Sequence, residues 1–156
     1  MRNLDATTAV HAGESHAKPF GALTTPVVQT STYTFSNTSE ILEYMRSKQW
    51  GDEPDRDEYG RYSNPTIRTA EDKLAALEGA ERALLFASGM NAITTTLLTL
   101  LSSGEHMILM SDCYHRTREF AEVYLERWGI KTTLVPINDF DALAAAVRPE
   151  TRLIFA

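Results

Sequence analysis

Apolar and polar positions repeat regularly only in the second part of the chain, from about Tyr62 onward. Asn64 is a good helix N-cap, Pro65 suits the first helical position, and Gly79 suits the residue after a helix. Between them the apolar residues fall on one helical face: Ile67, Ala70, Leu74 and Leu77. This spacing predicts an amphipathic helix that starts at Pro65 and stops at Gly79.

After Gly79, short apolar runs alternate with helical patterns. The predicted strands cover residues 83–87, 107–110, 132–135 and 153–156. The predicted helices between them run from about residue 89 through Leu101, over 116–128 and over 141–147. Short apolar strands alternating with helices are typical of an α/β protein with a mostly parallel sheet covered on both faces.

The first 61 residues have a different character. Residues 7–35 are rich in Thr, Ser, Pro and Gly without a sustained helical period, which predicts an extended N-terminal arm. A short helix is expected over 39–48, and the charged residues of 50–60 predict a solvated, mobile loop. We therefore divide the chain into an arm with its loop, 1–61, and the first part of an α/β domain, 62–156.

The composition argues against several classes of function and site. A formal net charge of −6 without a basic face argues against nucleic acid as a partner. The single cysteine, Cys113, excludes an intrachain disulfide and favours a reducing compartment, so we expect a cytoplasmic protein. No apolar run is long enough for a membrane span, and the first residues resemble neither a signal nor a transit peptide. The histidines show no metal-ligand spacing, so no metal site is expected: His11, His16, His106 and His115.

A possible anion site lies at Ser88, Gly89 and Met90, between a predicted strand and a predicted helix. A helix that begins there offers unpaired N–H groups and a positive dipole end, and a glycine lets a ligand approach the backbone. The alternative is a simple tight turn. The dinucleotide fingerprint G-x-G-x-x-G is absent, which argues against a dinucleotide ligand.

A second cluster lies at residues 59–66, with the sequence YGRYSNPT. Arg61 carries a planar fork suited to phosphate, and the hydroxyl of Tyr59 could reach the same group if the segment is extended. The alternative is that Arg61 pairs with the acidic loop before it.

A third cluster follows the predicted strand 107–110. Tyr114 there could stack on a planar heteroaromatic ligand at the same sheet edge as Ser88. The alternative is a half-buried tyrosine with a satisfied hydroxyl. Cys113 is interpreted as a packing residue because no histidine and carboxylate can be placed beside it.

In this order, the segments resemble the Cys/Met metabolism family of pyridoxal phosphate (PLP) enzymes, which includes synthases, lyases and sulfhydrylases of trans-sulfuration. The resemblance covers the whole chain. It rests on residues 8–13 (TAVHAG), 26–33 (PVVQTSTY), 59–66 (YGRYSNPT), 77–80 (LEGA), 88–90 (SGM) and 112–114 (DCY).

The resemblance implies a type I PLP-dependent transferase fold and a homotetramer, a dimer of dimers whose subunits share active sites. It implies that Tyr59 and Arg61 bind the cofactor phosphate of the neighbouring chain. Residues 88–90 would bind the phosphate of their own chain. Tyr114 would stack on the pyridine ring and act as a catalytic acid or base.

Within the family, residues 114–120 (YHRTREF) are similar to plant-type cystathionine γ-synthases. Methionine γ-lyases tend to carry a cysteine where Arg116 stands. The resemblance therefore implies γ-replacement on an activated homoserine ester with cysteine; a homoserine-ester sulfhydrylase or a γ-lyase is the alternative.

The lysine that holds the cofactor in this family is expected downstream of Ala156. Neither it nor the aspartate that pairs with the pyridine nitrogen is recognisable here. We expect an N-terminal fragment that is inactive alone, and a non-catalytic remnant is the alternative from another functional class.

Overall fold

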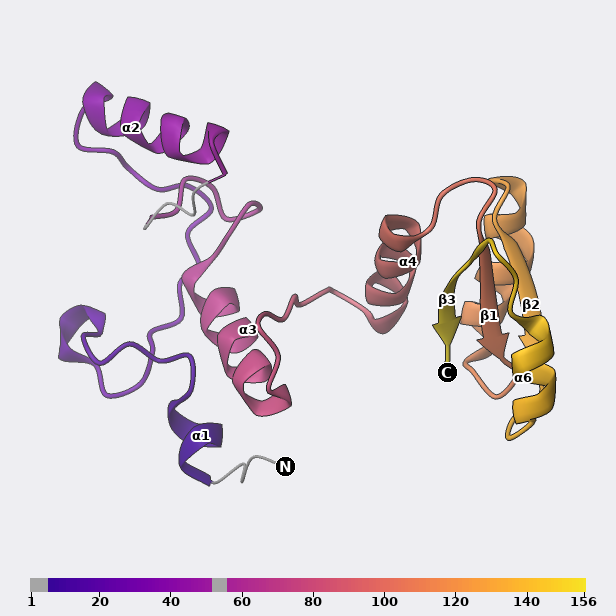
Figure 1. Cartoon of the computed structure of the whole chain (residues 1–156). Helices are drawn as coiled ribbons and strands as arrows, with labels where there is room; N and C mark the ends of the chain where they lie inside the picture. The colour runs from indigo at the N-terminus through magenta and orange to yellow at the C-terminus, as the bar shows by residue number, and fades with distance from the viewer. Residues whose placement is uncertain (1–5, 52–55) are drawn as a thin grey trace. The chain divides into compact units, whose positions relative to one another are not determined.

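A computed structural model of the chain describes residues 6–51 and 56–156. The chain forms two compact units, one up to Leu85 and one from Phe86 onward, and each is described by itself (Figure 1). The division of the sequence at residues 61 and 62 remains a prediction about the organisation of a longer domain.

The second unit is built on a parallel sheet of three strands in the order β2-β1-β3. The central strand β1 spans His106–Met110, and β2, Lys131–Val135, and β3, Thr151–Phe155, lie on either side of it. This confirms the predicted parallel α/β architecture.

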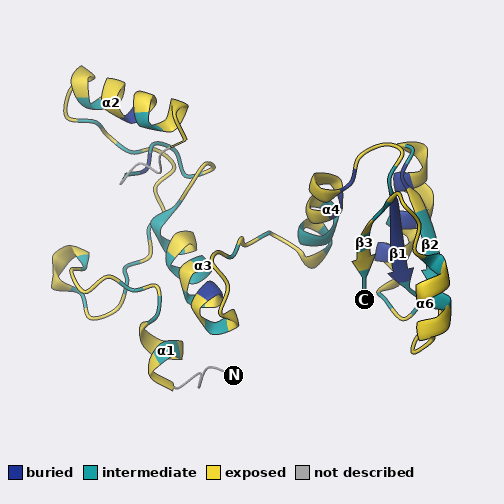
Figure 2. Cartoon of the chain, viewed as in Figure 1, coloured by how far each residue is buried: buried dark blue, intermediate teal, exposed yellow. Residues whose placement is uncertain are grey.

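Helices connect these strands. Helix α4 spans Gly89–Leu100, α5 spans His115–Glu119 and continues as a π-helical segment, η2, over Phe120–Leu125, and α6 spans Phe140–Ala146. The core of this unit consists of Leu97, Leu101, Met107, Leu109, Ala121, Leu125 and Ile130. Figure 2 shows β1 as the most buried element, as expected for the central strand of a parallel sheet.

In the described residues of the first unit, helices and an isolated antiparallel bridge are present, but no sheet. The helices are α1, Ala6–His11, the 3-10 turn η1, Pro19–Gly21, α2, Thr38–Gln49, and α3, Pro65–Glu78. In α3 the side chain of Asn64 accepts hydrogen bonds from the N–H groups of Thr66 and Ile67, and Gly79 adopts the left-handed φ of +67°. Both predicted ends of this helix are confirmed.

Two predictions about local structure were wrong. Residues 83–87 form no strand, because no backbone segment among the described residues pairs with them. The arm is not extended at its start, where α1 lies against α3 and the ammonium of Lys73 donates to the carbonyl of Val10 at 2.8 Å. This tertiary contact compensates for the weak helical pattern of the segment.

Within residues 6–51 and 56–156, no helix is long and apolar enough to cross a lipid bilayer.

Candidate functional site

The start of α4 presents two backbone donors. The hydroxyl of Ser88 accepts a hydrogen bond from the N–H of Asn91 at 3.1 Å, and the carbonyl of Ser88 accepts one from the N–H of Ala92 at 3.1 Å. Across the described part of the chain, the N–H groups of Gly89 and Met90 have no acceptor. These donors and the helix dipole suit an anion such as a phosphate.

Gly89 leaves room beside these donors. A β-carbon built on Gly89 would meet no atom within 4 Å, so the space next to its backbone is open. The φ of Gly89 is not positive, so the turn itself does not require a glycine at this position. The open space therefore allows a ligand group to approach the Gly89 backbone.

Tyr114 stands at the end of the loop that follows β1. It occupies the N-cap position of α5, its side chain is 57% exposed, and its ring meets the ring of His115 edge-on at 4.6 Å between centroids. The backbone of this loop is fixed by the N–H of Ser111, which donates to the carbonyl of Val135 at 2.9 Å. An exposed ring on a fixed backbone can stack on a planar ligand.

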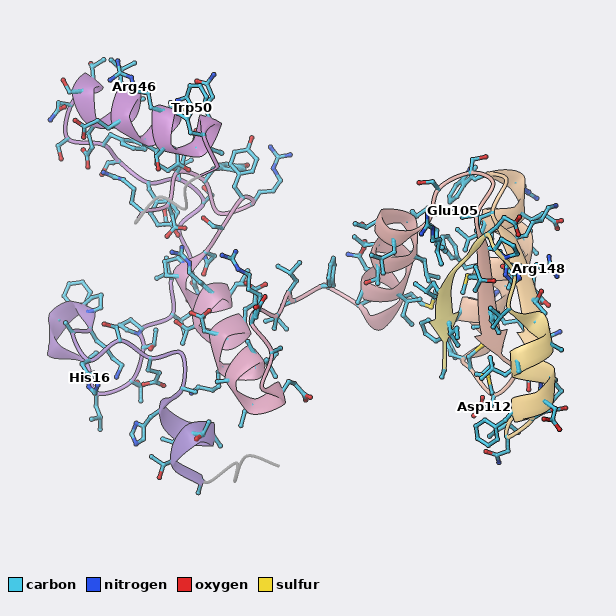
Figure 3. All side chains as sticks on the ribbon, viewed as in Figure 1. His16, Arg46, Trp50, Glu105, Asp112 and Arg148 are labelled. Carbon is cyan, nitrogen blue, oxygen red and sulfur yellow. The ribbon has the colours of Figure 1, made fainter. Side chains whose placement is uncertain are left out.

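Thr117 joins the start of α4 to the Tyr114 loop. Its hydroxyl contacts the sulfur of Met90 at 3.6 Å, its N–H donates to the carbonyl of Tyr114 at 2.9 Å, and its side chain is buried. Figure 3 shows Asp112, in the same loop, at the opposite end of the unit from Glu105. The structure thus brings residues 88–90 and Tyr114 to the carboxyl end of β1.

Cys113 lies within this loop and packs against the core. Its burial raises the pKa of the thiol, which disfavours the thiolate that a nucleophile needs. The structure therefore supports the interpretation of Cys113 as a packing residue.

Tyr59 and Arg61 lie in the first unit, on a turn that is pinned to the arm. Tyr59 forms an antiparallel bridge with Thr32, and the N–H of Gly60 donates to the carbonyl of Ser31 at 2.7 Å. A β-carbon on Gly60 would lie 3.1 Å from the carbonyl oxygen of Thr30, so glycine permits this close approach. The segment turns after Tyr59 rather than continuing as an extended strand.

Arg61 still lies beside Tyr59 in this turn. Its guanidinium carbon is 5.3 Å from the ring centre of Tyr59 and 5.4 Å from that of Tyr62. In residues 56–58 of the acidic loop, Asp57 pairs with Arg68 at 2.5 Å and Glu58 with Lys48 at 3.1 Å. The other acids of the loop, which are the alternative partners of Arg61, fall in residues 52–55 and lie outside the described residues.

Sequence reasoning missed three residues around these candidates: Lys48, Tyr62 and Thr117. Lys48 and Tyr62 contact each other across fourteen positions of sequence, so no local pattern indicates the contact. Thr117 could have been found, because it lies one helical turn after Tyr114 and faces the core.

A family model described as "Cys/Met metabolism PLP-dependent enzyme" matches residues 6–156. This chain belongs to that family. The match covers both units and includes every candidate residue described above, which confirms the resemblance seen in the sequence.

The chain is similar to curated relatives from more than one branch of the family. The chain is 42% identical over 155 residues to "Cystathionine gamma-synthase 1, chloroplastic" of Nicotiana tabacum, covering 98% of this chain and 28% of the relative. It is 43% identical over 145 residues to the protein of the same name from Arabidopsis thaliana, covering 92% of this chain and 25% of the relative. To the L-methionine gamma-lyase of Pseudomonas putida it is 40% identical, covering 96% of this chain and 36% of that protein. The chain thus spans about a quarter to a third of the length of these relatives.

Solved structures agree. The chain matches metB from Corynebacterium glutamicum with a TM-score of 0.80 and 29% identity, over 96% of this chain and 36% of that one. It matches an O-acetylhomoserine (thiol)-lyase, metY, from Campylobacter jejuni with a TM-score of 0.83 and 28% identity, over 96% of this chain and 36% of that one. The second structure carries a pyridoxyl-lysine monophosphate group. These matches confirm the predicted fold class.

Proposed function

We propose that the protein to which this chain belongs binds PLP at the carboxyl end of β1. The supporting observation is the pair of unpaired N–H groups at Gly89 and Met90, next to open space and joined through Thr117 to the exposed ring of Tyr114. The amides would hold the phosphate, and Ser88 would keep the helix end in place by capping it.

Tyr114 has two proposed roles. Its ring would cover one face of the pyridine, and its hydroxyl would move a proton at the reacting carbons of the substrate. The cofactor, when bound, supplies an electron sink for carbanion chemistry. The fixed backbone around Tyr114 would keep the ring in one position without a cost in loop ordering.

Tyr59 and Arg61 are proposed to bind the phosphate of a cofactor in a neighbouring subunit. The guanidinium carbon of Arg61 lies 5.3 Å from the ring centre of Tyr59, so the two side chains could both donate to one phosphate. This proposal requires a homo-oligomer with shared sites, which we propose to be a dimer of dimers.

The proposed reaction is γ-replacement, in which the thiolate sulfur of cysteine forms a bond to the γ-carbon of an activated homoserine ester and the ester carboxylate leaves. The support is the 42–43% identity to two relatives named as cystathionine γ-synthases. Arg116, which pairs with Glu119 at 2.6 Å, stands where the resemblance places a cysteine in γ-lyases. Methionine biosynthesis would be the corresponding role.

Two related reactions are the alternatives. The chain is 36% identical to an O-succinylhomoserine sulfhydrylase of Pseudomonas aeruginosa and 40% identical to a methionine γ-lyase. In the sulfhydrylase reaction, sulfide would take the place of cysteine as the nucleophile. In the γ-lyase reaction, the substrate would undergo elimination without a thiol.

The test uses the protein expressed from its complete gene. It is supplied with PLP, each homoserine ester in turn, and either cysteine or sulfide, and the products are separated by mass. Cystathionine as the main product supports the proposal. Homocysteine from sulfide, or a 2-oxo acid without a thiol, would assign one of the alternatives instead.

A non-catalytic remnant remains the alternative of another class. The coding sequence after Ala156 separates the two: a continued reading frame with a lysine motif supports the enzyme, and a stop codon supports the remnant.

The cytoplasm is our proposed compartment, on the ground of the free Cys113. Both plant relatives are named as chloroplastic, so a fluorescent fusion of the complete protein that enters an organelle would contradict the proposal.

A further inference from the structure

A cluster of aromatic rings and cations surrounds Tyr62, and we call it the Tyr62 cluster: Tyr44, Lys48, Tyr59, Arg61 and Tyr62. The ammonium of Lys48 lies 4.3 Å from the ring centre of Tyr62, and the guanidinium carbon of Arg61 lies 5.4 Å from it. The rings of Tyr59 and Tyr62 meet edge-on at 5.6 Å. Tyr62 thus contacts both members of the proposed phosphate pair and a cation from α2.

Lys48 is itself held in place. Its ammonium donates to the carboxylate of Glu58 at 3.1 Å and lies 5.6 Å from the ring centre of Tyr44. Tyr44 is buried, and its ring meets Phe35 edge-on at 5.4 Å. The hydrogen bond with Glu58 raises the pKa of Lys48, which keeps the ammonium charged. Helix α2 therefore supports the Tyr62 ring through a fixed cation.

Lys48 is poorly placed to bind a phosphate directly. Its ammonium is bonded to Glu58, and that carboxylate would repel a second anion at the same place. Among the described residues, Arg61 makes no ion pair with a carboxylate, so its donors remain available. The two cations thus differ in role.

Arg61 needs such support because its side chain has many rotamers. A guanidinium binds phosphate well only when its planar fork is oriented, and the entropy lost in orienting it weakens binding. Contacts that restrict the side chain beforehand reduce this loss.

We propose that Lys48 and Tyr62 are positioning residues that hold Arg61 and Tyr59 ready for the phosphate of the cofactor. The inference rests on the proposed function, and it gives α2 a role that the sequence did not indicate.

The test measures the dissociation constants of PLP and of pyridoxal, which lacks the phosphate, for the complete protein and its variants. Lys48→Met should weaken PLP binding about two- to fivefold, and Tyr62→Leu, which loses both cation contacts, up to about tenfold. Binding of pyridoxal should change much less, because only the phosphate contacts are affected. Lys48→Arg and Tyr62→Phe keep the charge and the ring and should bind PLP nearly as the wild type does.

Tyr124→Leu is the matched control, because it removes an exposed ring that lies 5.5 Å from the guanidinium carbon of Arg127 in the second unit. It should leave both constants unchanged. Unchanged PLP binding in Lys48→Met and Tyr62→Leu, or an equal loss for PLP and pyridoxal, would overturn the positioning role alone. A wild-type protein that binds no PLP would overturn the proposed function, and this inference with it.

Discussion

Different forces stabilise each of the two units of this chain internally. Among the described residues, the second unit buries nine apolar side chains and the first only two, Tyr44 and Ala75. The first unit relies on polar contacts instead, such as the pairs of Glu14 with Lys18 at 3.0 Å and with Lys73 at 3.3 Å. Apolar burial contributes more to stability than exposed ion pairs do.

This difference determines how firmly each unit holds its candidate residues. The second unit has a core that fixes the carboxyl end of β1, so its candidate residues stand on a rigid support. The first unit leaves apolar residues of α3 exposed, among them Ile67 and Leu74. Its candidate residues depend on a turn, a bridge and cation–aromatic contacts, and salt can screen the electrostatic part of these contacts.

The largest effect is expected from a cavity in the second unit. Leu109→Ala should lower the free energy of unfolding by about 2 to 5 kcal/mol, because Leu109 is fully buried in β1. Leu74→Ala, the same change on the exposed face of α3, should cost less than about 1 kcal/mol. Urea unfolding of both variants measures the difference, and equal losses would show that the α3 face is covered in the protein in solution.

The next largest effect on stability is expected at Gly13, with Gly89 as the comparison. Gly13 has a φ of +72°, and a β-carbon there would lie 2.6 Å from the carbonyl oxygen of Thr69, so Gly13→Ala should cost about 2 to 4 kcal/mol. Gly89→Ala meets no atom within 4 Å and should leave stability unchanged or slightly raised. Thermal unfolding checks both expectations.

Gly89→Ala also bears on the proposed site. The new methyl group would occupy the open space beside the donor amides, so we expect weaker PLP binding by a protein of normal stability. A variant that binds PLP as the wild type does would contradict the placement of the phosphate at Gly89.

Much of the helix and strand content could be predicted because its signals are local. Asn64 and Gly79 mark the ends of α3 through their own backbone preferences, and Ser88 marks the start of α4 in the same way. The apolar runs at β1, β2 and β3 were recognisable because each is short and follows a helical pattern, although only β1 is buried along most of its length. The adjacency of residues 88–90 and Tyr114 was expected from the rule that parallel strands end at one edge, but residues 83–87 form no strand. The contact of Thr117 with Met90 brings the two segments together instead.

Contacts between distant segments could not be predicted. Residues 83–87 have the composition of a strand, but a strand exists only where a partner accepts its hydrogen bonds. The contact of Lys48 with Tyr62 depends on the turn after Tyr59, and the contact of Thr117 with Met90 depends on helix packing. Periodicity within one segment carries no information about either.

A smaller effect is expected from the buried acid of the first unit. Asp57 accepts hydrogen bonds from Ser63 and from Arg68, and its side chain is 7% exposed. Asp57→Ala should cost about 1 to 3 kcal/mol, because the partners of a charged hydrogen bond lose their acceptor. Glu122→Ala removes an exposed pair with Arg118 and should cost less than about 1 kcal/mol. The unfolding midpoints of both variants measure the difference. Equal midpoints would contradict the importance of polar contacts in the first unit.

The smallest effects concern pH, where the two units should respond in different ranges. His106 is buried at the amino end of β1, and its ring nitrogens lie 2.8 Å from the hydroxyls of Thr151 and Thr133. Burial, followed by the nearby Arg148, lowers its pKa below the usual 6.5. As pH falls below 6.5 the unfolded chain gains a proton that the folded unit resists, so the second unit loses stability.

The first unit should respond at lower pH. Hydrogen bonds from Lys18 and then Lys73 lower the pKa of Glu14 below its usual 4.5, so their stabilising effect is present above 4.5 and is lost as pH falls through the folded value. Hydrogen exchange resolved by segment should therefore show the strands of the second unit weakening first on acidification, and α1 and α3 only later. His106→Gln should remove the first step and Glu14→Gln the second, each without affecting the other. If one substitution removed both steps, the units would unfold as a single cooperative body, and the contrast between them would not hold in solution.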